Sequence, residues 1–226
     1  MSKRYFVTGT DTEIGKTTIA AALLHSARQR GLSTAAVKPV AAGCERTAEG
    51  LRNEDALALM NECQPPLDYE LINPVALEAA IAPHIAAHEE DVTLTADALS
   101  AGCKAVFERN ADLTLVEGAG GWRVPLNDRQ TLADLAGLLA IPVVMVVGMR
   151  LGCINHALLT AEAIKADGLV LAGWVANCVD PDMSRPDENL ATLKQLIEAP
   201  CLGVVPWLEQ PSAGSIAAHL DISELL

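Results

Sequence analysis

Residues 9–18 read Gly-Thr-Asp-Thr-Glu-Ile-Gly-Lys-Thr-Thr, and these residue types suit phosphate binding. The N–H groups of a glycine-containing turn and of the helix that follows it present partial positive charge to an anion. Gly15 lets the backbone approach closely, the Lys16 ammonium adds a full charge, and the Thr17 hydroxyl is suited to Mg²⁺. The spacing departs from the usual phosphate-loop pattern, because five residues separate Gly9 from Gly15. The alternative, an ordinary strand–helix turn, is disfavoured because the segment follows a predicted strand and opens a predicted helix.

Three further side chains could serve a bound triphosphate. Glu117 directly follows the apolar run 113–116, and Asp55 lies in the segment Arg-Asn-Glu-Asp-Ala-Leu. Both carboxylates are suited to Mg²⁺, although an aspartate early in a helix often only complements the helix dipole. Lys38 ends another apolar run and could neutralise a transferring phosphoryl group or hold a carboxylate. The alternative for Lys38 is a solvated lysine at the end of a strand.

Short apolar runs that alternate with longer Ala- and Leu-rich segments must position these residues. We predict strands at residues 5–8, 33–37, 113–116, 142–148, 170–176 and 203–206. We predict helices at residues 16–30, 54–62, 93–110, 131–140, 155–167 and 187–199. Continuous apolar runs such as 143–147 are typical of strands that are buried on both faces. The sequence therefore predicts a single α/β domain over residues 1–226, a three-layer P-loop NTPase-like fold with a mostly parallel sheet and helices on both faces.

Composition excludes several classes of function. The chain has 29 acidic and 16 basic residues, a net charge of −13, so a general nucleic-acid-binding face is not expected. An anionic membrane surface would repel such a chain, and its longest apolar stretch is too short to span a bilayer. The six cysteines are widely spaced, which indicates reduced thiols rather than a zinc site. We therefore expect a cytoplasmic protein that binds neither nucleic acid nor membrane.

Several segments, in order along nearly the whole chain, resemble dethiobiotin synthetases. They include residues 9–17, Lys-Pro-Val at 38–40, 50–59, Val-Glu-Gly-Ala-Gly-Gly-Trp at 116–122, 151–164, 173–177 and 203–208. The resemblance implies an ATP-dependent ligase of biotin synthesis that acts on 7,8-diaminononanoate and CO₂. A carbamate forms on one amine, ATP converts it to a carbamic-phosphoric anhydride, and the second amine closes the ring of dethiobiotin. ADP and phosphate are released.

The resemblance also implies roles for individual residues. The catalytic residues would be Lys38, Lys16 and Thr12, and the Mg²⁺ ligands would be Thr17, Asp55 and Glu117. Nucleotide-binding positions would be Glu13, Ile14, Gly15, Lys16, Thr17, Thr18, Asp55, Glu117, Gly118, Ala119, Gly120, Asn177, Pro206, Trp207 and Leu208. Substrate contacts would come from Thr12, Lys38, Gly152, Cys153 and Asn155. The last three would lie in a loop that reaches the substrate carboxylate across the interface of a homodimer.

Some positions depart from the family pattern, and two other functions remain open. Ala42 and Cys178 replace a hydroxyl residue and an aspartate that are common in the family, and Ser212 replaces an acidic ribose ligand. A nucleotide-switch ATPase of the partition type shares the predicted fold, but it carries a signature lysine where this chain has Asp11. A diverged amidoligase of the same fold is the other alternative. Such enzymes usually add a glutaminase domain, for which 226 residues leave no room.

Overall fold

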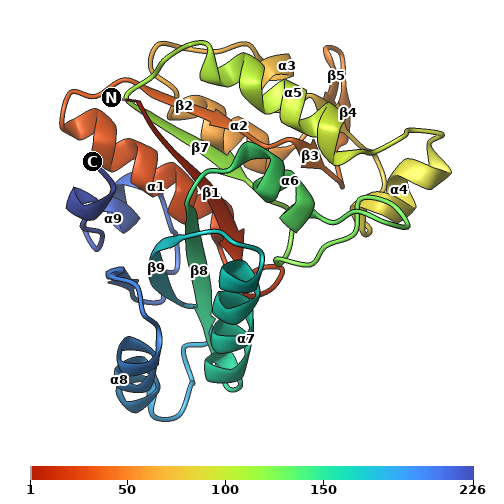
Figure 1. Ribbon diagram of the computed structural model, residues 1–226. Helices are drawn as coiled ribbons and strands as arrows, with labels where there is room; N and C mark the ends of the chain where they lie inside the picture. Colours follow the sequence, from red (N-terminus) through yellow and green to blue (C-terminus); the bar gives the residue numbers. More distant parts are fainter. Residues whose placement is uncertain (1) are drawn as a thin grey trace.

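The computed structural model describes residues 2–226 and has a six-stranded sheet at its centre (Figure 1). The strands are β1 (Lys3–Gly9), β2 (Thr34–Val37), β7 (Leu113–Glu117), β8 (Val143–Met149), β9 (Leu171–Cys178) and β10 (Cys201–Val205). They lie in the order β10-β9-β8-β1-β7-β2, and all neighbouring strands are parallel. The six predicted strands are therefore confirmed, with no end displaced by more than two residues.

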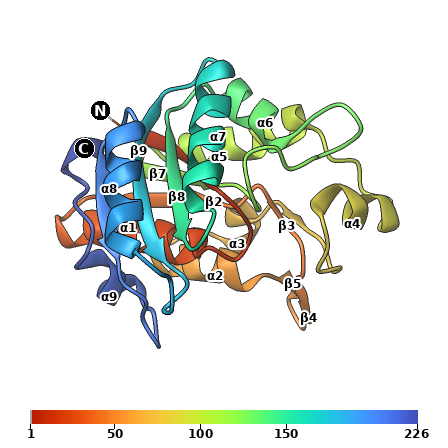
Figure 2. The same cartoon turned by 90° about the horizontal axis from the view of Figure 1, so that it is seen from below.

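Helices cover both faces of the sheet (Figures 1 and 2). One face carries α1 (Lys16–Gln29), α2 (Glu54–Asn61) and α9 (Ala213–Ala217). The other carries α5 (Ala96–Phe107), α6 (Leu132–Leu139), α7 (Cys153–Ala166) and α8 (Pro186–Leu196). Successive β8 residues alternate between the faces, so that Val144 packs with α1 and Met145 packs with α7. A strand covered on both sides needs an apolar residue at each position, which explains the uninterrupted apolar run.

The segment between β2 and α5 contains short elements that the sequence did not predict. They are β3 (Val40–Ala41), β4 (Glu45–Thr47), β5 (Gly50–Arg52), α3 (Tyr69–Ile72), β6 (Val75–Ala76) and α4 (Pro83–Glu89), and a final turn, η1 (Ser223–Leu225), closes the chain. β3 pairs with β6 in parallel, and β4 and β5 form a hairpin. The hairpin and α4 lie at the end of the molecule opposite to α8 (Figures 1 and 2). Strands of two or three residues carry no periodic pattern, so sequence analysis could not detect them.

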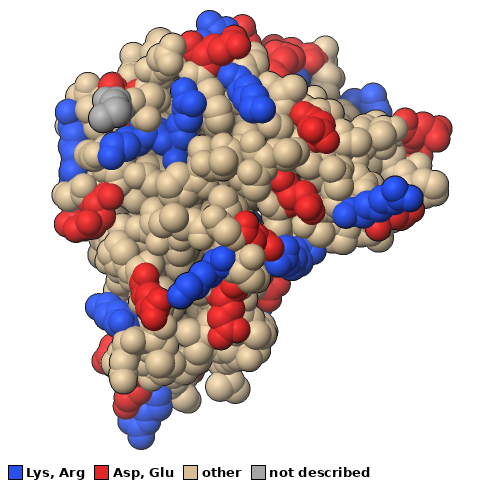
Figure 3. All heavy atoms as spheres, in the orientation of Figure 1, with Lys and Arg blue, Asp and Glu red and all other residues tan. Residues whose placement is uncertain are grey.

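The distribution of charged side chains and the hydropathy of the helices can be compared with the composition. On the face drawn in Figure 3, Lys and Arg side chains are interspersed with Asp and Glu side chains. Within residues 2–226, no helix has both the length and the apolar character needed to cross a bilayer.

The strand order decides where a ligand can bind. β1 lies between β7 and β8; from β1 the chain goes to the edge strand β2, returns to β7 beside β1, then crosses to β8 and runs outward through β9 to β10. In open α/β sheets, ligands bind beyond the carboxyl ends of the strands where the chain direction reverses in this way. The ends of β1, β2 and β7 place the phosphate loop, Lys38 and Glu117 at this edge.

Candidate active site

The loop between β1 and α1 has the backbone geometry of an anion-binding turn. Glu13 and Gly15 are left-handed, with φ of 57° and 79°, and Gly15 caps the start of α1. Left-handed residues within such a turn direct neighbouring N–H groups toward one concavity. The Thr18 hydroxyl donates to the Gly15 carbonyl at 2.9 Å, and Lys16 Nζ donates to the Asp11 carbonyl at 2.9 Å. The predicted phosphate loop therefore has the shape that its chemistry requires.

Asn177, near the end of β9, holds this loop in place through its side chain. Its side-chain Nδ2 donates to the Ile14 carbonyl at 2.8 Å. A Cβ atom on Gly15 would collide with Asn177 Nδ2 and would lie 3.0 Å from the Thr18 hydroxyl. Glycine is thus required at position 15 both by the left-handed φ and by the contact with Asn177.

The phosphate loop opens into a cleft of about 800 Å³. Ten of the predicted site residues line it, namely Thr12, Glu13, Gly15, Lys16, Thr17, Thr18, Lys38, Asp55, Ala119 and Gly120. The rest of the lining, mostly apolar, consists of Ala42, Ala80, Ile81, Ala82, Pro83, Arg123, Val124 and Pro125. The cleft therefore joins a charged end, beside the phosphate loop, to an apolar wall.

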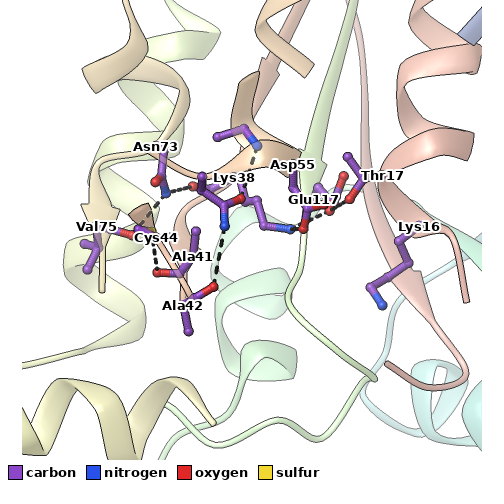
Figure 4. Close-up of polar contacts among 12 residues, drawn as sticks. Lys16, Thr17, Lys38, Ala41, Ala42, Cys44, Asp55, Asn73, Val75 and Glu117 are labelled. Carbon is purple, nitrogen blue, oxygen red and sulfur yellow. Dashed lines mark hydrogen bonds and ion pairs between the residues drawn. The ribbon is translucent and has the colours of Figure 1, made fainter. Parts of the chain in front are cut away.

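Lys38 lies at the charged end and is only 4% exposed. Its Nζ donates to Glu117 Oε1 at 2.6 Å and to Asp55 Oδ2 at 2.7 Å (Figure 4). The Thr17 hydroxyl donates to the same Glu117 Oε1 at 2.7 Å, and Glu117 is fully buried. The structure thus joins Thr17, Lys38, Asp55 and Glu117 in one cluster, and the alternative of a solvated Lys38 is wrong.

Burial and charge set the protonation of this cluster. Burial acts to lower the pKa of Lys38, but the Glu117 and Asp55 carboxylates outweigh it and hold that pKa above its usual value. Burial acts to raise the pKa of Asp55, but Lys38 outweighs it and the pKa is lowered. Burial lowers the pKa of Lys16, a shift that Glu117 partly offsets. Lys38 is therefore an ammonium ion at neutral pH, suited to neutralise negative charge rather than to accept a proton.

The cluster also fits a magnesium ion. Glu117 Oε2 is buried and, within residues 2–226, has no hydrogen-bond partner, so the carboxylate retains a free oxygen. Thr17 and Asp55 add further oxygen ligands beside it. Mg²⁺ is usually bound by one or two carboxylates, with phosphate and water oxygens completing its shell. Among the described residues, no three His, Cys, Asp or Glu side chains are grouped so that they alone could hold a metal ion, so the protein's share of a metal site here would be of this partial kind.

Replacing Thr17 with valine is expected to reduce the dependence of ATP affinity on Mg²⁺. Valine has nearly the same shape but lacks the hydroxyl that points to Glu117. We expect the gain in affinity on adding Mg²⁺ to fall about tenfold, the lower end of the effect for groups that orient a metal site. Calorimetry of a non-hydrolysable ATP analogue with Mg²⁺ and with EDTA measures this gain. Thr192→Val is the matched control, because it removes a hydroxyl that donates to the Glu188 carbonyl at 2.8 Å within α8, away from the cleft. An unchanged gain in Thr17→Val contradicts the role.

Comparison with known proteins identifies the family. A family model described as an AAA domain matches residues 3–214. An ATP-dependent dethiobiotin synthetase from Pseudomonas aeruginosa strain UCBPP-PA14 is 66% identical over 221 residues, which cover 98% of this chain and 97% of that protein. This chain belongs to the dethiobiotin synthetase family. The family member from Cellvibrio japonicus is 63% identical over 227 residues and covers 100% of this chain and 99% of its own. The resemblance found in the sequence is confirmed.

Solved structures of distant proteins share the fold. The ParA family ATPase from Chlorobium tepidum has a TM-score of 0.57 at 14% identity, covering 100% of this chain and 95% of its own. The MinD cell division protein from Aquifex aeolicus has a TM-score of 0.56 at 13% identity, covering 96% and 94%. The predicted P-loop NTPase-like fold is therefore confirmed.

The residues predicted to contact substrate from a loop differ in structure from that expectation. Cys153 and Asn155 were expected in a loop, but they occupy the first turn of α7. Gly152 makes this possible because its φ of 93° turns the chain directly into the helix. Cys153 is buried in the core whereas Asn155 is exposed, and none of the three lines the cleft of its own chain.

Of the positions predicted for the adenine pocket, Asn177 contacts the phosphate loop. Asn177 in β9 is in register with Val205 in β10, so Pro206, Trp207 and Leu208 follow directly from the neighbouring strand. Trp207 is 50% exposed. Ser212 instead caps α9, where its hydroxyl accepts the N–H of Ser215 at 3.1 Å.

Gly118 packs inward rather than lining the cleft. Its N–H donates to the Val7 carbonyl at 3.0 Å, and a Cβ atom at this position would lie 3.2 Å from the Phe6 ring. A side chain at this position would therefore require the buried Phe6 ring to move slightly.

Sequence analysis missed two arginines at the site. Arg123 lines the cleft and forms an ion pair with Asp167 at 2.8 Å. Arg150 follows β8 and is paired with Asp11 of the phosphate loop. This pairing balances an acidic side chain that would otherwise weaken an anion-binding loop. The signal was available for Arg150, because it is a cation two residues beyond the strand predicted at 142–148, much as Lys38 follows the strand predicted at 33–37.

Proposed function

We propose that this chain closes the cyclic urea of dethiobiotin from 7,8-diaminononanoate, CO₂ and ATP. The observation that carries the proposal is the buried Lys38 ammonium, which contacts both Asp55 and Glu117 next to the phosphate loop. Membership of the dethiobiotin synthetase family identifies the substrate class that this arrangement would serve.

The proposed chemistry needs charge neutralisation more than a protein nucleophile. One substrate amine loses a proton and adds to CO₂, which forms a carbamate. The carbamate oxygen then takes the γ-phosphoryl group of ATP, and ADP leaves. The second amine attacks the carbonyl carbon of this anhydride, the bond to phosphate breaks, and the ring closes. A carbamate is a poor electrophile until it is phosphorylated, so catalysis rests on alignment and on fixed positive charge.

Residues of the phosphate loop and the cleft would meet these requirements. The phosphate-loop amides and Lys16 would bind the β- and γ-phosphates, and Lys38 would stabilise the carbamate and the transferring phosphoryl group. Thr17, Asp55 and Glu117 would hold Mg²⁺, which neutralises phosphate charge when bound. Thr12 lines the cleft between these groups and the apolar wall, where it can contact substrate.

The remaining contacts involve adenine and the far end of the substrate. Asn177 can donate to and accept from adenine, with residues 206–208 beside it. The apolar wall around Ile81 suits the alkyl chain of the substrate. Gly152, Cys153 and Asn155 of one protomer would reach the carboxylate of substrate held by its partner in a homodimer. In support, Leu151, just before the helix, is 92% exposed, and Leu159, one turn after Asn155 on α7, is 56% exposed.

A cytoplasmic location also belongs to this proposal. All six cysteines are free thiols, and four of them are buried. Free thiols suit a reducing compartment.

The decisive test supplies the purified protein with the diamine, bicarbonate and Mg·ATP. We expect phosphate release only when the diamine is present, together with one dethiobiotin for each phosphate. A matched reaction without diamine measures the basal ATPase. Equal phosphate release in both reactions would instead favour a nucleotide-switch ATPase.

A further inference from the structure

Behind Lys38 and Asp55 lies a buried polar network formed by Asn53, Tyr69 and Asn73. All three are less than a tenth exposed. The Tyr69 hydroxyl accepts the backbone N–H of Asn53 at 2.7 Å and donates to Asn73 Oδ1 at 3.1 Å. Each polar side-chain atom of the three residues has a hydrogen-bond partner. A fully satisfied buried network of this kind holds one arrangement of its members.

One arm of the network holds the backbone of Lys38. Asn73 Nδ2 donates to the Lys38 carbonyl at 2.9 Å and to the Val75 carbonyl at 3.0 Å (Figure 4). The Lys38 N–H donates to the Ile72 carbonyl at 2.6 Å. Both backbone polar groups of Lys38 are thus held by the end of α3, which starts at Tyr69. The position of the ammonium depends on this contact because Lys38 lies just beyond the end of β2.

The other arm holds the start of α2, which carries Asp55. The Asn53 side chain caps this helix by accepting the Ala56 N–H at 3.2 Å, and its Nδ2 donates to the Ala42 carbonyl at 3.4 Å. Since Tyr69 bonds the Asn53 backbone, the same hydroxyl sets the positions of both arms. The Lys38–Asp55 ion pair, at 2.7 Å, links the two arms directly.

We propose that Asn53, Tyr69 and Asn73 are positioning residues that fix the Lys38 ammonium against the Asp55 carboxylate for phosphoryl transfer. This inference rests on the proposed function, because it assigns the geometry of that site to three residues that do not line the cleft. The network connects the end of β2, which carries Lys38, to the start of α2, which carries Asp55. Small displacements of such supporting groups are costly to catalysis because the reacting groups must stay aligned.

The test compares Tyr69→Phe with Tyr5→Phe. Each variant removes one buried hydroxyl and keeps the ring, and in Tyr69→Phe the stacking of Arg52 on the ring is also kept. The Tyr5 hydroxyl donates to the Leu225 carbonyl at 2.9 Å, away from the cleft. We expect Tyr69→Phe to lower kcat about tenfold with little change in KM for the diamine, the range for residues that orient an active site. Tyr5→Phe should keep the wild-type kcat while losing a similar amount of thermal stability.

A second readout does not depend on turnover. Calorimetry measures how much Mg²⁺ increases the affinity for a non-hydrolysable ATP analogue. We expect this increase to fall about tenfold in Tyr69→Phe and to stay unchanged in Tyr5→Phe. If the wild-type protein forms no dethiobiotin, the proposed function fails, but this measurement still decides whether the network positions Asp55.

Asn73→Ala and the double variant Tyr69→Phe/Asn73→Ala complete the experiment. If the residues act as one unit, the double variant should lose no more kcat than the worse single variant. The proposal is overturned if Tyr69→Phe and Tyr5→Phe behave alike in kcat and in Mg²⁺ dependence. It is also overturned if the losses in kcat from Tyr69→Phe and Asn73→Ala simply multiply.

Discussion

Replacing Lys38 with alanine is expected to lower kcat for dethiobiotin formation by about 10²–10³-fold, the effect typical of removing one preorganised group that stabilises developing charge. The ammonium is buried, and the Glu117 and Asp55 carboxylates keep its pKa above the usual value. A fixed positive charge beside the phosphate loop therefore disappears, and water cannot replace it in the same geometry. Steady-state assays of dethiobiotin with saturating diamine and Mg·ATP measure the loss.

The controls for this variant distinguish a loss of turnover caused by the missing charge from one caused by misfolding. Lys165→Ala removes a lysine that pairs with Glu198 at 3.2 Å on the surface, and it should keep wild-type turnover. Lys38→Gln retains a hydrogen-bond donor without the charge, so it should remain nearly as inactive as Lys38→Ala. Circular dichroism and nucleotide affinity show whether each variant is folded. A Lys38→Ala protein that is folded and retains more than a tenth of wild-type turnover would rule out the catalytic role.

Replacing Gly15 with alanine should weaken ATP binding by about 10²-fold or more, because displacements of about 1 Å in an aligned site can have this effect. The new Cβ atom would collide with Asn177 Nδ2, which braces the loop through the Ile14 carbonyl. It would also force alanine to adopt a φ of 79°, which L side chains disfavour. Calorimetric titration with an ATP analogue measures the loss.

Gly31→Ala is the matched control for this effect. Gly31 has nearly the same φ, 77°, but a Cβ atom at this position would meet nothing within 4 Å. The control should lose about 1 kcal/mol of folding stability through backbone strain and keep wild-type affinity for ATP. If Gly31→Ala lost as much affinity as Gly15→Ala, general destabilisation rather than the contact with Asn177 would be the cause.

The central sheet and the phosphate loop could be predicted because local signals are strong there. The run at 143–147 is apolar at each position, and the β8 strand that contains it is covered by α1 on one face and α7 on the other. Residues 9–18 combine glycine, lysine and threonine between a strand and a helix, a context that few other structures share. Apart from α2, the segment between β2 and α5 gave no such signal, because its elements are short and are held by tertiary contacts.

Residue types in the sequence determined the chemistry of the site, while the tertiary structure decided which candidates work together. Lys38 and Asp55 were each open to an ordinary surface role, and only the fold brings them within 2.7 Å of each other. Tyr69 and Asn73 carried no signal at all, because a supporting hydrogen bond depends on where distant backbone groups meet. Covalent neighbours determine local conformation and chemical type, whereas burial and contacts between separate elements determine charge state and alignment. For this protein, the local sequence identifies a phosphate site, and the tertiary contacts assemble a candidate catalytic centre around it.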